Sequence, residues 1–94
     1  MSKMSQINHE DAQIIALKAL AFLASDEERI KRFMSITGLM PQEIRAQAAE
    51  PAFLGGVLEH LRNDQSLLLM FAESANIIPA LIDAASFRLS GPCP

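Results

Sequence analysis

The sequence predicts an all-α fold, a compact bundle of five or six short helices. No segment alternates apolar and polar residues as a half-buried strand does, and valine occurs only at position 57. The residues that begin and end helices recur at regular distances along the chain. A length of 94 residues, half of them apolar, suits one folded domain over 1–94, with residues 1–7 and 92–94 expected to be flexible tails.

Three helices are predicted in the first half of the chain. Asn8 can cap the first helix, because its side chain can accept a hydrogen bond from a free backbone N–H. Ser25 and Glu28 match a capping box at the start of the second. Gly38 can end that helix in the left-handed conformation, and Pro41 suits the first turn of the third. With their caps, these helices are predicted at 8–24, 25–37 and 41–49.

Three further helices follow from the same kinds of signal in the second half. Pro51 and Pro79 each suit the first turn of a helix, and Asp64 can cap the helix between them. Asn76 can end that middle helix in a left-handed turn. The predicted ranges are 51–62, 64–76 and 79–89.

The second half repeats the first at an offset of 38 residues, with 20–49 matching 58–87. The matches fall on caps, turns and apolar positions: Leu20, Leu23, Asp26, Phe33, Pro41, Ile44 and Ala46 recur as Leu58, Leu61, Asp64, Phe71, Pro79, Ile82 and Ala84. Two pseudo-symmetric three-helix halves would explain this pattern. The alternative is that short helical hairpins share these cap and turn residues without a common origin.

Two helices are apolar on nearly every side, which is typical of buried helices. They are the segment up to Ala24 and the one containing residues 67–71. Gly55 and Gly56 lie inside the predicted helix 51–62, where glycine is unfavourable. We expect them to permit a close crossing with the alanine-rich first helix; a hinge is the alternative.

Charge and cysteine content limit the partners and the compartment. Eight basic against 11 acidic residues give a net charge of −3, whereas nucleic-acid and anionic-membrane partners favour a basic excess. The apolar stretch 12–24 contains Lys18 and is shorter than the roughly 20 residues of a membrane span. Cys93 is the only cysteine, so no internal disulfide can form and a cytoplasmic location is expected.

The residue patterns of catalytic, cofactor and metal sites are missing from the sequence. His9 and His60 are the only histidines and lie far apart, which leaves few ligands for zinc. Asp64 follows His60 by four residues, as in a surface pair on one helix face. No phosphate-binding glycine loop or nucleophile elbow is present. We therefore expect no cofactor, no metal and no enzymatic activity.

A helix-turn-helix is the alternative function that the sequence offers. The segment 32–49 places Gly38 in a turn with Leu39 after it and Ile44 in the next helix, a spacing similar to that motif. Arg45 is a possible base-reading side chain, but few basic residues surround it. Because similar turn signals recur at Asn76, a structural turn explains the pattern better than DNA binding.

The apolar content exceeds what a domain of this size can bury, since such domains cover only about 60–65% of their unfolded surface. We expect the surplus to face a protein partner or a second copy of the chain in a homodimer. Met34, Met40, Arg45 and Met70 are the candidate interaction residues, because methionine adapts to varied apolar partners. The predicted function is a non-catalytic helical interaction module.

Several of these residues also carry a family resemblance, which extends from about Asn8 to Gly91. They are Gly38-Leu39 with Pro41, Ile44 and Arg45; Phe53-Leu54 with Val57-Leu58; Asp64 with Leu67, Leu68 and Phe71; and Pro79 with Leu89 and Gly91. The pattern resembles an uncharacterised bacterial family of small helical proteins, domain-of-unknown-function family 3572. The resemblance implies a small helical cytoplasmic protein and carries over no functional residues.

Overall fold

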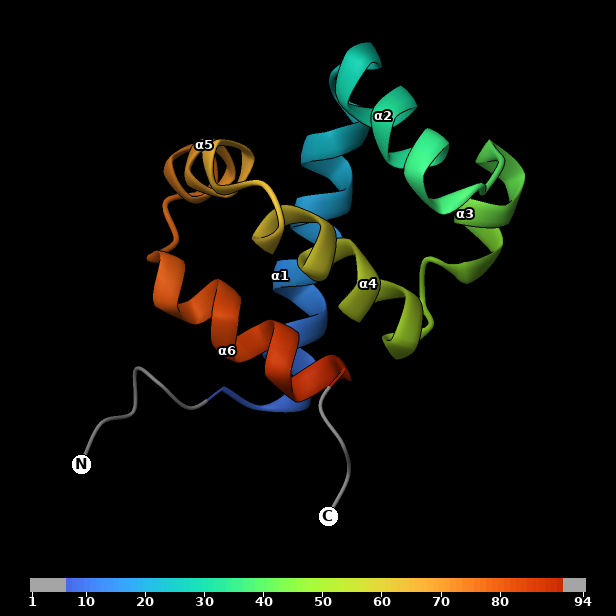
Figure 1. Cartoon of the computed structure of the whole chain (residues 1–94). Helices are drawn as coiled ribbons and strands as arrows, with labels where there is room; N and C mark the ends of the chain where they lie inside the picture. Colours follow the sequence, from blue (N-terminus) through green and yellow to red (C-terminus); the bar gives the residue numbers. More distant parts are fainter. Residues whose placement is uncertain (1–6, 91–94) are drawn as a thin grey trace, which may run out of the picture.

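The computed structural model describes residues 7–90, which form six helices and no strand (Figure 1). The all-α prediction is therefore confirmed. The expected tails lie outside the described residues except for Ile7, as does Cys93. The helices are α1 (His9–Ala24), α2 (Glu27–Thr37), α3 (Pro41–Gln47), α4 (Pro51–Arg62), α5 (Gln65–Ala75) and α6 (Pro79–Ser90).

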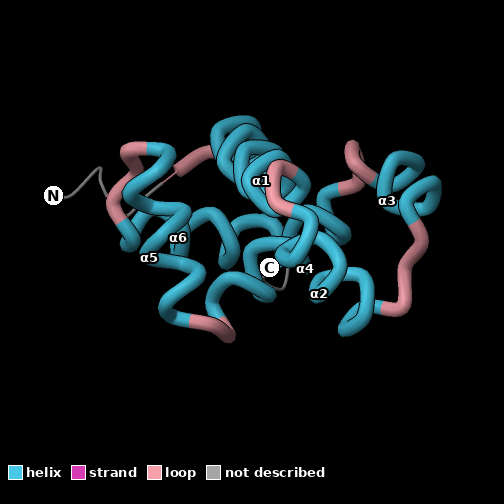
Figure 2. The backbone as a smooth tube through the Cα atoms, turned by 90° about the horizontal axis from the view of Figure 1, so that it is seen from above, coloured by secondary structure: helices cyan, strands magenta, loops and turns pink. Residues whose placement is uncertain are grey.

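The centre of the fold is formed by α1, α4 and α6, which pack extensively against one another. Helix α5 covers one end of this group, and α2 packs on α1. Helix α3 lies at the opposite end from α5 and packs extensively against none of the other described helices (Figure 2). The fully buried side chains include Leu23, Phe33, Leu58, Phe71 and Ile82.

The helix starts show which polar residues act as caps. Asn8 caps α1 as predicted, its Oδ1 accepting from the Asp11 N–H at 2.7 Å. The capping box of Ser25 and Glu28 was wrong, because Asp26 is the cap of α2. The Ser25 hydroxyl instead donates to the Phe22 carbonyl at the end of α1, 2.7 Å away.

The turns after α2 and α5 have the predicted left-handed conformation. Gly38 has φ 78° and Asn76 has φ 59°. Pro41, Pro51 and Pro79 each occupy the first position of a helix. Helix α3 ends at Gln47, two residues earlier than predicted. The two halves share an aspartate cap on their second helix, the left-handed turn after it and the proline that opens their third helix. Their third helices pack differently, and an internal duplication stays a prediction.

The expectations about burial were wrong for the two apolar helices and for Gly56, while the close crossing at Gly55 stays a prediction. Neither apolar helix is buried on every side: α1 exposes 46% of Ile14 and 44% of Leu17, and α5 exposes 47% of Leu69 and 45% of Met70. Gly55 is buried, whereas a Cβ on Gly56 would meet no atom within 4 Å, so Gly56 is not needed for a close crossing. Among the described residues, no single helix has the length and hydropathy needed to cross a membrane.

Candidate functional site

An apolar groove lies between α1, α2 and α3. Its volume is about 340 Å³. Each helix contributes residues three or four positions apart, a spacing that places them on one helix face. The lining residues are Leu20 and Ala24 of α1, Ile30 and Met34 of α2, and Pro41, Ile44, Arg45 and Ala48 of α3 and its C-terminal cap.

The position of α3 depends on the turn that precedes it and on a single buried side chain. Thr37 Oγ1 donates to the Phe33 carbonyl and accepts from the Leu39 N–H, which fixes the end of α2. Glu43 accepts from the Met40 N–H at 2.8 Å and so closes the first turn of α3. Ile44 is the only residue of α3 that is buried. The groove remains open because α3 stands beside α1 and α2 without packing tightly on either.

Arg45 supplies the only charge among the groove residues. Its side chain is exposed and makes no hydrogen bond or ion pair within the part of the chain that the structure describes. It shares the groove-facing side of α3 with Ile44. The groove therefore offers an apolar surface with one unneutralised cation at its edge.

The four candidate interaction residues do not form one surface. Met34 and Arg45 line the groove together. Met40 is 59% exposed but does not line the groove, and Met70 lies on α5 beside Arg29. Sequence reasoning missed the residues of α1 and the first turns of α2. The spacing of Leu20 with Ala24 and of Ile30 with Met34 was the available signal, but it does not show which faces lie together.

A second groove, of about 250 Å³, contains His60 between α2, α4 and α5. The planes of the His60 and Phe33 rings make an angle of 79°, a T-shaped arrangement, and the ring centroids are 5.1 Å apart. Burial lowers the pKa of His60, as does the nearby Arg32, while Asp64 raises it. Asp64 accepts from the Leu67 N–H and so caps α5. His60 is thus a half-buried packing residue rather than one member of an exposed surface pair.

The α2–α3 segment contains the predicted turn but supports DNA reading poorly. A reading helix presents several polar side chains away from the helix that it packs on. Here α3 has seven residues, and Arg45 lies on the same side as the buried Ile44. Among the described residues, no group of three or more His, Cys, Asp and Glu side chains is placed to hold a metal ion.

Comparison with known proteins identifies the family but no function. No curated protein and no solved structure matches the chain significantly. A family model described as protein of unknown function, DUF3572, matches residues 9–92. That range contains all six helices and every residue of the α1–α2–α3 groove. The chain therefore belongs to the DUF3572 family.

Proposed function

We propose that the protein is a non-catalytic interaction module whose α1–α2–α3 groove binds an amphipathic helix of a protein partner. The observation that carries this proposal is the apolar groove with the unpaired Arg45 at its edge. The partner helix would place apolar residues in the groove and an acidic residue against Arg45. We place this interaction in the cytoplasm, since a chain with one cysteine needs no oxidising compartment to fold.

An amphipathic helix suits both the shape and the chemistry of the groove. The walls are helices, and a fourth helix laid between them would bury apolar residues at positions i, i+3, i+4 and i+7. Each buried Å² of apolar surface stabilises such a complex by about 25 cal/mol before the costs of association. The exposed side of α1, with Leu17, continues the apolar surface beyond the groove.

Charge complementarity favours an acidic partner helix over a second copy of this chain. An acidic side chain beside Arg45 would gain a charge-assisted hydrogen bond where neighbouring apolar residues reduce the competition from water. Arg45 is the only charged residue that lines the groove in the described part of the chain. Two copies joined groove to groove would therefore leave each Arg45 without an opposite charge.

Photo-crosslinking in native cells tests the proposal. A photoreactive residue placed at Ala48 should crosslink to one protein through an acidic amphipathic segment. Arg45→Glu should abolish this product, whereas Gln42→Glu, a charge change on the same helix, should leave it intact. Replacing the contacted acidic residue of the partner by Lys should restore the crosslink to Arg45→Glu.

Three outcomes would contradict this function. A crosslink that persists unchanged in Arg45→Glu would show that the charge plays no part in recognition. Crosslinks only to a second copy of the chain would replace the partner helix by a homodimer. Recovery only of nuclease-sensitive material would favour the helix-turn-helix interpretation.

A further inference from the structure

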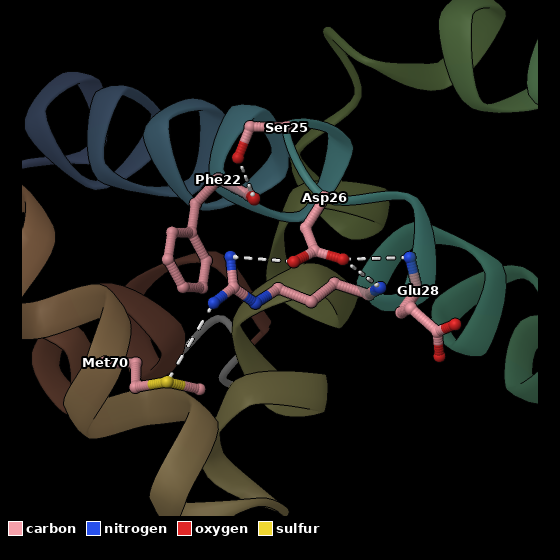
Figure 3. Close-up of polar contacts among 6 residues, drawn as sticks. Phe22, Ser25, Asp26, Glu28 and Met70 are labelled. Carbon is pink, nitrogen blue, oxygen red and sulfur yellow. Dashed lines mark hydrogen bonds and ion pairs between the residues drawn. The ribbon is translucent and has the colours of Figure 1, made fainter.

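Arg29 lies where α1, α2 and α5 meet, and its contacts hold the guanidinium in place. The guanidinium carbon is 4.3 Å from the centroid of the Phe22 ring, and that ring packs on Phe71 at 5.5 Å. One terminal nitrogen lies 3.8 Å from an Asp26 carboxylate oxygen. The other donates to the Met70 sulfur at 3.9 Å. Figure 3 shows the labelled side chains of Phe22, Asp26 and Met70 gathered at this junction.

The Met70 sulfur accepts from Arg29, and the residue that carries it lies at the protein surface. The residue is 45% exposed. It borders two surface grooves, of about 250 and 410 Å³, and Arg29 borders both as well. A thioether sulfur is a weak hydrogen-bond acceptor, so the N–H group that Arg29 points at Met70 makes only a weak hydrogen bond.

We propose that Met70 is a site of reversible oxidation by peroxide, and that Arg29 binds the resulting sulfoxide. A sulfur lone pair attacks one oxygen of hydrogen peroxide, and the O–O bond breaks. The transferred oxygen loses its proton to the leaving hydroxide, which departs as water. Sulfur is oxidised by two electrons and peroxide is reduced. Methionine sulfoxide reductases, with a thiol as the electron source, can reverse this change.

The geometry gives the sulfoxide oxygen a donor that is already in position. The Met70 sulfur and the Arg29 nitrogen are 3.9 Å apart. An oxygen bonded to the sulfur would lie within hydrogen-bond distance of this nitrogen when the S–O bond is inclined to the line from sulfur to nitrogen. A strong, charge-assisted hydrogen bond then replaces a weak one. Methionine oxidation normally disrupts packing. Here it strengthens the contact between α2 and α5.

Urea unfolding of peroxide-treated protein, with oxidation at each methionine followed by peptide mass spectrometry, tests this proposal. Peroxide treatment should lower the unfolding equilibrium constant of the wild type. The factor of decrease should be about five times the factor that the same treatment produces in Met70→Leu. Reduction by methionine sulfoxide reductase should reverse the shift. Met70→Gln, which carries an amide oxygen near the sulfoxide position, should show similar stabilisation without oxidation.

Two further variants separate the role of Arg29 from a general effect of oxidation. In Arg29→Gln, oxidation of Met70 should no longer stabilise the protein. Met40→Leu is the matched control, because Met40 is 59% exposed and its removal should leave the peroxide response intact. The proposal is overturned if Met70 stays reduced while Met40 is oxidised, if its oxidation destabilises the wild type, or if Arg29→Gln responds as the wild type does.

Discussion

His60 illustrates how the surroundings of one side chain produce pH-dependent stability. Burial lowers its pKa, as does Arg32, while Asp64 acts in the opposite direction. The unfolded chain therefore binds the proton more readily than the folded protein, and stability decreases as pH falls below about 6.5. We expect the melting temperature to decrease between pH 7.5 and 5.5, and less so in His60→Gln. Equal slopes in the wild type and His60→Gln would contradict this explanation.

The adjacent glycines of α4 predict stability changes of opposite sign. Gly56→Ala adds a methyl group in open space and should raise the free energy of unfolding by about 1 kcal/mol through helix propensity. Gly55 is buried, so Gly55→Leu should lower it by about 3 kcal/mol through overpacking. Urea denaturation of both variants measures the difference. A tolerated leucine at Gly55 would remove the close-crossing explanation.

At the scale of the helix, the cap of α2 provides the clearest test. Asp26 accepts from the backbone N–H groups of Glu28 and Arg29, at 2.9 and 3.3 Å. Asp26→Ala should therefore lower the free energy of unfolding by about 1–2 kcal/mol. Ser25→Ala removes only a hydroxyl bonded to the end of α1 and should cost under about 0.5 kcal/mol. Thermal denaturation measures the loss of stability in both variants. A larger loss in Ser25→Ala than in Asp26→Ala would show that Ser25 caps α2, as the sequence predicted.

Local signals predicted the helices well because caps and turns involve residues close in sequence. Asn8, Gly38 and the helix-opening prolines act through their own backbone surroundings. The capping box was misplaced because Ser25 and Asp26 are both good caps, and the end of α1 decides which one is free. The groove could not be predicted in the same way. Leu20, Met34 and Arg45 come together only through the packing of three helices.

Across the whole molecule, the two halves use similar helices in different ways. Helix α6 packs along both α4 and α1, whereas α3, its counterpart in the 38-residue repeat, packs extensively against no described helix. The fully buried residues of α6 thereby complete the core, while the residues of α3 form one wall of the groove. Stability is consequently carried by the helices that pack on one another, and α3 contributes to the core only through Ile44.

The repeat supplies a matched pair of substitutions for this difference. Ile82 of α6 is fully buried, and Ile82→Ala should lower the free energy of unfolding by about 3–5 kcal/mol through a cavity in the core. Ile44, its counterpart in α3, borders the open groove, so Ile44→Ala should cost only about 1–2 kcal/mol. Hydrogen exchange after Ile44→Ala should accelerate in residues 41–47 and remain slow in α1, α4 and α6. Accelerated exchange throughout the molecule would instead show that α3 belongs to the cooperative core.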